Sequence, residues 1–241
     1  MGEARHYKFF PLVMTAFVVV LLCSNLIGPA KVCTVPLPFT LPWGGDAIVF
    51  GAGNLFFPIS YIFGDVLTEV YGYARARKVI WAGFGAMAFA TVMAWVVIAM
   101  PPDPRTGFNT VLQPALETVF GATWRIVVGS MVAYWAGDFV NSFILAKMKV
   151  ITEGRHLWTR TIGSTLVGQG VDTLIFYPIA FWGIWEADRM LTVMGFNWCI
   201  KVGVEVVLTP ATYATVGFLK RVEGVDHYDR DTKFTPFSLS D

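Results

Sequence analysis

The chain has 241 residues, of which 55% are hydrophobic and only 15% are charged, and its mean hydropathy is +0.58. Soluble domains carry about a quarter charged residues, so the composition indicates an integral membrane protein with a single domain over residues 1–241. The net charge of +1 and the spread of basic residues over several loops argue against direct nucleic-acid binding. The three cysteines have no metal-binding or disulfide-framework spacing, and we expect no cofactor and no metal.

Six apolar stretches are long enough to cross a bilayer, which takes about 20 helical residues. The spans that we expect are residues 9–28, 47–71, 79–100, 126–146, 161–184 and 197–219, followed by a polar tail at 220–241. Prolines and paired glycines in residues 30–46 predict an extramembrane turn region, for which a short hairpin is one candidate form. Residues 108–120 are a candidate interfacial helix. Pro58 and several glycines indicate that the second span is kinked or broken.

The basic residues predict the orientation of the chain. Most of the 18 lysines and arginines fall in the loops and tail that lie on the side of the two termini. By the positive-inside rule, this side faces the cytoplasm. The predicted fold class is therefore an all-α integral membrane protein with six transmembrane helices and cytoplasmic N- and C-termini.

Two carboxylates inside the second span are the most informative polar residues. Asp65 and Glu69 lie one helical turn apart, and Tyr61 lies one turn before Asp65 on the same helix face. A carboxylate within a membrane is costly and usually faces a bundle interior or a water-filled cavity. Because Glu69 is close to the cytoplasmic end of the span, an ion pair with Arg75 or Lys78 is the alternative to a substrate contact.

Three later spans also carry polar groups at helical spacing. Asp138 and Asn141 lie in the fourth span and Gln169 and Asp172 in the fifth. In the sixth span, Lys201 and Glu205 lie at i and i+4, where an internal ion pair is the simplest interpretation and a substrate contact the alternative. The candidate substrate-binding residues are Asn25, Tyr61, Asp65, Glu69, Asp138, Asn141, Gln169, Asp172, Phe176 and Glu205.

This set of side chains suits a small heterocycle with both donors and acceptors on its edge. Carboxylates accept hydrogen bonds, Asn and Gln both donate and accept, and aromatic side chains such as Phe176 stack on planar rings. The simpler alternative is that the polar groups only hold the helices together through interhelical hydrogen bonds, each of about 0.6–2 kcal/mol.

Several stretches taken together resemble the queuosine precursor transporters, also called the YhhQ or VUT family. The matching stretches are F-P-I-S-Y-I-F-G-D-V-L-T-E-V-Y-G (57–72), G-D-F-V-N-S (137–142), W-T-R-T-I-G-S-T-L-V-G-Q-G-V-D-T-L-I-F (158–176), E-V-V-L-T-P-A-T-Y (205–213) and L-K-R-V-E-G-V-D-H-Y-D-R-D-T-K-F-T-P-F (219–237). The resemblance implies import of a 7-deazaguanine precursor of queuosine, preQ0 or preQ1, across the bacterial inner membrane for tRNA modification, with queuine as the substrate of some members. It also implies a relation to the six-helix substrate-binding subunits of energy-coupling-factor vitamin transporters.

Two other functions stay open on the sequence alone. The chain has no phosphate-binding loop for ATP, so a vitamin- or purine-binding subunit that needs a separate energising partner is one alternative. A membrane-embedded enzyme or a scaffold is the other, although the usual protease and esterase motifs are missing. The expected partners are a 7-deazapurine, the lipid bilayer and a second copy of the chain, since transporters of this size often dimerise.

Overall fold

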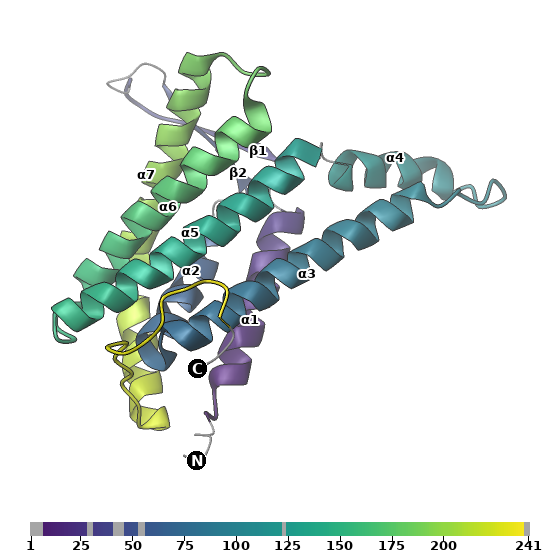
Figure 1. The fold of residues 1–241 in the computed structure, drawn as a ribbon. Coiled ribbons are helices and arrows are strands. Elements are labelled where there is room, and N and C mark those ends of the chain that lie inside the picture. Colours follow the sequence, from purple (N-terminus) through teal and green to yellow (C-terminus); the bar gives the residue numbers. More distant parts are fainter. Residues whose placement is uncertain (1–6, 28–30, 41–45, 53–55, 122–123, 239–241) are drawn as a thin grey trace.

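A computed structural model describes residues 7–27, 31–40, 46–52, 56–121 and 124–238 of the chain. These residues form seven α-helices, one π-helical turn and one two-stranded hairpin (Figure 1). In chain order the elements are α1 (Phe10–Ile27), β1 (Val32–Pro36), β2 (Ala47–Gly51), α2 (Phe57–Val66), η2 (Leu67–Tyr71), α3 (Tyr73–Ala99), α4 (Asn109–Phe120), α5 (Trp124–Ile151), α6 (Leu157–Phe181) and α7 (Ala187–Glu223). The mostly helical fold is therefore confirmed, with the hairpin as an addition to it.

The surface of the helices has the character of a membrane protein. By length and composition, α1, α3 and α7 are the described helices able to cross a membrane. The helices α5 and α6 have 28 and 25 residues, also more than the roughly 20 needed, but they do not meet the same criterion of composition. On α6, Thr161 and Gln169 are buried whereas Leu166 and Leu174 are exposed. A polar interior beneath an apolar surface fits contact with lipid, while the count of six spans stays a prediction.

Two predicted span boundaries are wrong. Residues 47–51 form strand β2 and do not begin a helix, and they pair antiparallel with β1 so that Pro36 lies opposite Ala47. A short apolar run is compatible with either a strand or a helix, and here the partner strand decides. The helix begins at Phe57, with Pro58 in its first turn, where proline favours helical geometry; residues 53–55 lie outside the described residues. The last helix begins at Ala187, earlier than predicted, and continues to Glu223.

The predicted break in the second span is present at its C-terminal end. The chain passes from α2 into the π-helical turn η2, and Gly72 follows with a φ of 87°. A Cβ atom at Gly72 would lie 2.2 Å from the ring of His227, so both the backbone conformation and the space require glycine. The carboxylate of Asp229 then accepts hydrogen bonds from the Tyr73 amide at 3.0 and 3.2 Å. The tail thereby caps the start of α3.

Both ends of the described chain meet at one end of the helices. Glu223, at the end of α7, accepts hydrogen bonds from the backbone amides of Lys8 and Phe9 just before α1. The tail then crosses the start of α3, where Arg77 donates to two tail carbonyl oxygens. Figure 1 shows this end at the bottom and the hairpin at the opposite end. We call these the tail end and the hairpin end; that the tail end faces the cytoplasm stays a prediction.

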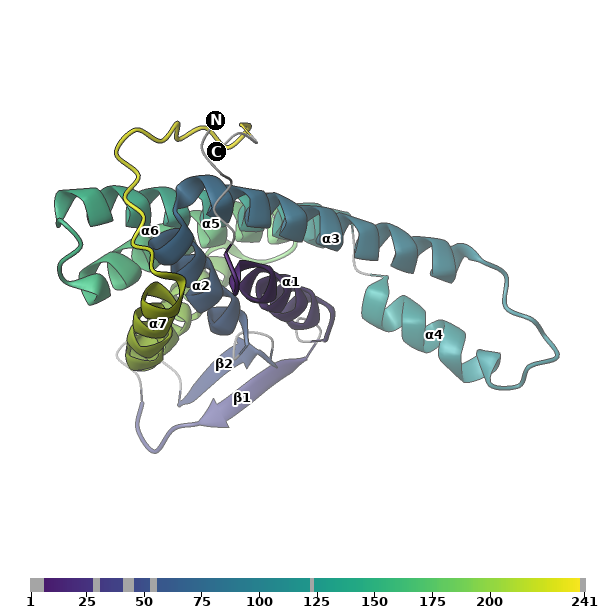
Figure 2. The same ribbon diagram turned by 90° about the horizontal axis from the view of Figure 1, so that it is seen from below.

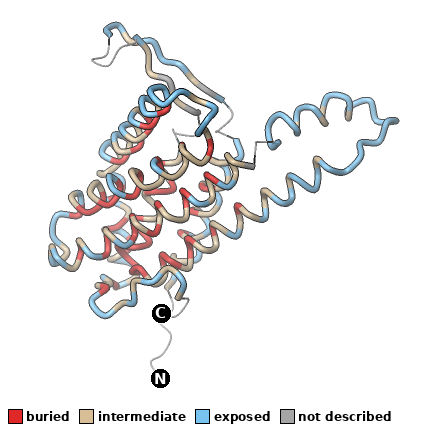
Figure 3. Tube along the Cα trace, turned by 45° about the horizontal axis from the view of Figure 1, so that its top comes forward, coloured by how far each residue is buried: buried red, intermediate tan, exposed pale blue. Residues whose placement is uncertain are grey.

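The burial of side chains is concentrated where α1, α2, α5, α6 and α7 meet. Figure 3 shows the buried residues in that region, and Figures 1 and 2 show α4 and the far half of α3 projecting away from it. Every residue of α4 is at least partly exposed, and α3 exposes large apolar side chains such as Phe89 and Trp95. The predicted helix at 108–120 is confirmed, and its interfacial position stays a prediction.

Two glycines set the close packing of α5 against α6. A Cβ atom at Gly137 would lie 3.0 Å from the Cβ of Asp172, and one at Gly168 would lie 2.8 Å from the Cβ of Asn141. Small residues allow such close backbone approach between membrane helices. The packing therefore brings polar residues of both helices to the same interface.

Candidate substrate-binding site

The helix α2 and the turn η2 carry three buried polar side chains at four-residue intervals. Tyr61, Asp65 and Glu69 are only 9%, 0% and 0% exposed. Each is joined by polar residues of α5, α6 and α7, so that the three define levels of one polar column. From the hairpin end to the tail end we call them the upper level (Tyr61, Asp138, Asp172, Lys201), the middle level (Asp65, Asn141, Gln169, Glu205) and the lower level (Glu69, Lys149, Arg160, Lys220).

The upper level contains an ion pair between two helices. The Nζ of Lys201 donates to Asp172 Oδ2 at 2.6 Å, and it lies 5.9 Å from the centre of the Tyr61 ring. Asp138 is close enough to be influenced by the charges of both Asp172 and Lys201. The predicted ion pair between Lys201 and Glu205 is therefore wrong, because α6 presents a carboxylate directly across the interface from the lysine.

The middle level is the most deeply buried part of the column. The Asn141 side chain donates to Asp65 Oδ1 at 2.7 Å, which joins α5 to α2. Gln169 follows Gly168, the residue that packs on Asn141. Glu205 lies one turn from Lys201 along α7, and among charged groups it has the largest electrostatic influence on Asp65. The four residues of the middle level are between 0% and 6% exposed.

Five oxygen atoms of the middle level have no hydrogen-bond partner in the described part of the chain. They are Asp65 Oδ2, Asn141 Oδ1, Gln169 Oε1 and both carboxylate oxygens of Glu205. An unsatisfied buried polar group costs about 1–3 kcal/mol, and folded proteins keep few of them without a reason. All five atoms are acceptors, and none of them receives a hydrogen bond from the donors present in the described residues. This level can bind a molecule that brings N–H and O–H donors.

A small pocket reaches the column between α1, α2, α3 and α5. Its lining includes Tyr61, Asp138 and Asn141. Its volume is about 10 Å³, which is room for about one water molecule. A heterocycle would therefore need the helices to move apart, and the structure shows the site closed. Among the described residues, no group of three or more His, Cys, Asp or Glu side chains could hold a metal ion.

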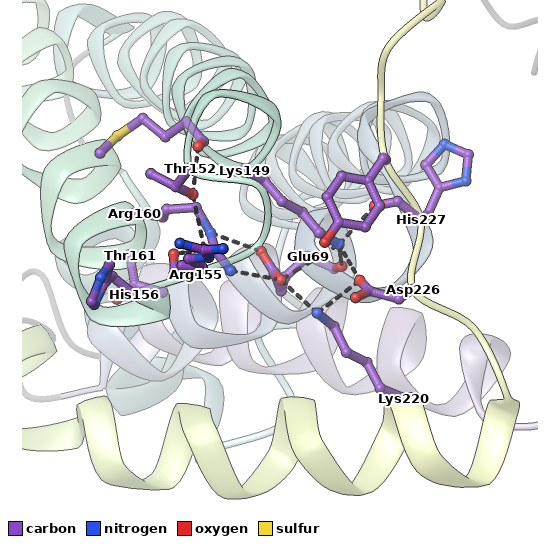
Figure 4. A network of polar contacts seen from close by, with 12 residues as sticks. Glu69, Lys149, Thr152, Arg155, His156, Arg160, Thr161, Lys220, Asp226 and His227 are labelled. Atoms are coloured by element: carbon purple, nitrogen blue, oxygen red, sulfur yellow. Dashed lines mark hydrogen bonds and ion pairs between the residues drawn. The ribbon is translucent and has the colours of Figure 1, made fainter.

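The lower level is an ion network around one carboxylate (Figure 4). Arg160 donates from Nη2 to Glu69 Oε1 at 2.9 Å and from Nε to Oε2 at 3.3 Å. Lys220 donates to the same Oε1 at 2.7 Å. Lys149 donates to the Glu69 backbone carbonyl at 2.6 Å, and its Nζ lies 3.4 Å from Oε1. Glu69 is thus held by three cations from α5, α6 and α7.

The tail covers the lower level. Asp226 accepts from Lys149 at 2.5 Å and lies 2.8 Å from the Nζ of Lys220 (Figure 4). Burial by itself would raise the pKa of Asp226, but the two lysines outweigh it and the pKa lies below its ordinary value. Arg75, a predicted alternative partner of Glu69, instead donates to a backbone carbonyl of η2. The interactions fix the tail to the end of the column.

The two remaining predicted residues lie outside the three levels. Asn25 donates to the backbone carbonyl of Leu21 within α1. Phe176 packs edge to face with Tyr177, its ring centre 5.1 Å away. The hydroxyl of Tyr177 accepts a hydrogen bond from Asn197 at 2.6 Å. Phe176 therefore borders the upper level through an aromatic cluster, whereas Asn25 forms a local contact.

The comparisons with known proteins agree on one family. Residues 51–215 match the family described as "Putative vitamin uptake transporter". The chain is 34% identical over 163 residues to the "Probable queuosine precursor transporter" of Bacillus subtilis (strain 168), covering 67% of this chain and 69% of that protein. It is 24% identical over 219 residues to the "Queuosine precursor transporter" of Escherichia coli (strain K12), covering 89% of each. The chain belongs to the queuosine precursor transporter family. No solved structure matches it significantly.

Family membership confirms the resemblance read from the sequence and makes the chain a membrane transporter, not an enzyme. The upper and middle levels lie entirely within the matched residues 51–215. In the lower level, Lys220 lies beyond them, as does the tail that covers it. All the unpartnered acceptors of the middle level thus lie within the residues shared with the family model.

Sequence reasoning missed the role of three basic residues in the lower level. Lys149, Arg160 and Lys220 were counted as loop or tail charges, yet the side chains of Lys149 and Arg160 are each only 1% exposed. One signal was available for Arg160. The buried residues of α6 recur every three or four positions from Leu157 to Ala180, and both Arg160 and Gln169 belong to that stripe.

Proposed function

We propose that the chain imports 7-deazaguanine precursors of queuosine, preQ0 or preQ1, across the bacterial inner membrane for tRNA modification. Family membership supports a transporter, and the names of its relatives support a queuosine precursor as the substrate class. The observation that carries the proposal is the middle level, whose residues keep five buried acceptor oxygens without a hydrogen-bond partner among the described residues.

A 7-deazaguanine brings donors for these acceptors. Its N1–H and 2-amino group lie side by side, and one carboxylate accepts from both, as carboxylates do from base-edge amines. Asp65 is in place for this contact, since its Oδ2 is unpartnered. Asn141 and Gln169 carry amides that can donate to the O6 edge. Tyr61 and Phe176, bordering the column from the upper level, are the aromatic side chains proposed to stack on the ring.

The transmembrane arrangement belongs to the same proposal. The helices α1, α3, α5, α6 and α7 each cross the bilayer, and α2 with η2 contributes the remaining, broken span. Both termini then lie in the cytoplasm at the tail end, where the basic residues Lys149, Arg160 and Lys220 gather. The exposed apolar side chains of α3 fit contact with lipid. A homodimer stays a prediction.

The test is growth-independent and uses tRNA as the readout. The chain is expressed in a bacterium that cannot make preQ0 and has no importer of its own, preQ0 or preQ1 is supplied, and queuosine in tRNA is measured. We expect queuosine only when the chain is present. Asn141→Leu should abolish it, and Asn109→Leu, on the projecting α4, should not. Absence of queuosine despite normal amounts of protein in the membrane would overturn the proposed substrate or show that a separate energising partner is required.

A further inference from the structure

Asp65 on α2 and Glu205 on α7 are buried carboxylates that have no counter-ion in the described part of the chain. Both are 0% exposed, and Glu205 has the largest electrostatic influence on Asp65 of any charged group. Of their four carboxylate oxygens, Asp65 Oδ1 accepts from Asn141 at 2.7 Å. The other three have no hydrogen-bond partner among the described residues. A neutral substrate by itself would leave two negative charges in the interior of the membrane.

The surrounding charges do not neutralise this pair. The charged groups with the largest electrostatic influence on Asp65 are all acidic: Glu205 on α7, Glu69 on η2 and Asp138 on α5. The cation of the upper level is bound to Asp172 at 2.6 Å. The cations of the lower level surround Glu69, with Arg160 at 2.9 Å. Two neighbouring carboxylates in a dry, low-dielectric site cannot both stay ionised.

We propose that Asp65 and Glu205 together bind one proton, and that this proton crosses the membrane with the substrate. The proposal rests on the transport function proposed above. The proton arrives from water at the hairpin end, forms an O–H bond on one carboxyl group of the pair and leaves to water at the tail end. No other bond changes. One positive charge enters per molecule of neutral substrate, so a proton gradient can drive accumulation.

The arrangement of the middle level explains why the proton and the substrate would cross the membrane together. The proposed substrate contacts Asn141 and Gln169 lie in the same level as the pair. Protonation makes one carboxyl a donor and removes the repulsion between Asp65 and Glu205. A bound heterocycle then accepts from one carboxyl and donates to the other. Substrate affinity therefore depends on occupancy by the proton, and the reverse follows by linkage.

The transport test uses the full-length protein in proteoliposomes that contain a pH-sensitive dye. The probe is preQ0, whose nitrile does not titrate near neutral pH, and the membrane potential is clamped. We expect entry of preQ0 to acidify the lumen by about one proton per molecule. A gradient of one pH unit, acidic outside, should drive accumulation toward tenfold. Entry of preQ0 without acidification, or entry driven by sodium alone, would overturn the coupling and leave the transport function standing. If no preQ0 enters, the transport proposal and this inference fail together.

A binding test assigns the proton to the pair. The dissociation constant of preQ0 is measured for the purified protein between pH 5 and 9, and for wild type we expect it to rise toward tenfold per pH unit at the alkaline end. Glu205→Gln mimics the protonated carboxyl and should remove this pH dependence, whatever its effect on affinity, and Asp65→Asn should do the same. Glu205→Asp keeps a titratable group and should retain the dependence, as should the control Glu117→Gln on α4. If Asp65→Asn and Glu205→Gln both keep the wild-type pH profile, the pair does not hold the proton. If one of these two variants fails to fold or to bind preQ0, the pH dependence of the other one decides whether the pair holds the proton. Loss of the pH dependence in Glu205→Asp would also contradict the assignment.

Discussion

Replacing Glu69 with glutamine distinguishes a structural role of the lower level from a substrate contact. The substitution keeps the size of the side chain and removes its charge. Arg160, whose side chain is 1% exposed, would then lack its carboxylate partner, whereas Lys149 would keep Asp226 at 2.5 Å. We therefore expect Glu69→Gln to destabilise the protein strongly, mainly because the buried cation of Arg160 stays behind.

The expected size of the effect follows from the burial of these groups. Removing one partner of a buried ion pair costs about 3–5 kcal/mol. Lys220 adds less because its side chain is 22% exposed and keeps Asp226 as a partner. The glutamine carbonyl still accepts one hydrogen bond from Arg160. We therefore expect the free energy of unfolding to fall by about 3 kcal/mol, which is the low end of that range. In a chain of this size, 1 kcal/mol shifts Tm by about 2–4 °C, which gives a decrease of roughly 6–12 °C.

The measurement is thermal unfolding of the purified protein in detergent, alongside preQ0 uptake in the proteoliposomes. Glu117→Gln is the matched control, because Glu117 lies on the exposed helix α4 and accepts a hydrogen bond only from Gln113 among the described residues. Its Tm should change little. If Glu69→Gln abolished uptake while its Tm stayed at the wild-type value, the lower level would not be a structural network. Glu69 would then be a substrate contact.

Two further predictions test the packing of the column and the attachment of the tail. Gly168→Ala should lower both Tm and substrate affinity, because the new methyl group would lie 2.8 Å from the Cβ of Asn141. Gly203→Ala should be tolerated, because nothing lies within 4 Å of a Cβ atom there. Equal effects of the two substitutions on Tm and affinity would contradict the packing argument. For the tail, burial by itself would raise the pKa of Asp229, but hydrogen bonds, including that from the Tyr73 amide, outweigh it and lower the pKa. Since the folded-state pKa lies below the unfolded value of about 3.9, its stabilisation is fully present above that value and is lost as pH falls through the folded-state pKa. We therefore compare cleavage by pepsin with that of an unfolded substrate at the same pH. Relative to that substrate, the wild-type tail should be cleaved faster as the pH falls below about 4, whereas the tail of Asp229→Asn should be cleaved equally fast at about pH 4 and below. A wild-type tail that stays protected at pH 2 would refute this reasoning.

The middle level could be predicted from the sequence because its signal is local. A carboxylate or amide within a long apolar stretch is recognisable without knowledge of its neighbours, and Asp65, Asn141, Gln169 and Glu205 were all identified in this way. Which groups face each other depends on how helices pack. The sequence spacing favoured an ion pair between Lys201 and Glu205. Because α6 packs against α7, Lys201 instead pairs with Asp172.

The second strand of the hairpin and the lower level were not predicted, for two other physical reasons. Ala47–Gly51 is a short apolar run, which fits a strand as well as the start of a helix, and only pairing with β1 makes it a strand. In the lower level, Arg160 lies at the fourth residue after the α6 N-cap, where a basic residue normally meets solvent. Its carboxylate partner Glu69 lies on η2, which comes from a distant part of the chain.

The three levels of the column also indicate which end of the transporter must open last. In the upper level, the side chains of Asp172 and Lys201 are still 20% and 11% exposed, so the column is less enclosed there than at the lower level. In the lower level, Glu69 is fully enclosed by cations and covered by Asp226. Several ion pairs of the lower level therefore separate a substrate bound at the middle level from the tail end. Release of the substrate at the tail end requires these ion pairs to break. Because an uncompensated buried charge is costly, we expect the lower level to stay closed until the proposed binding of substrate and proton offsets the cost of separating its ion pairs.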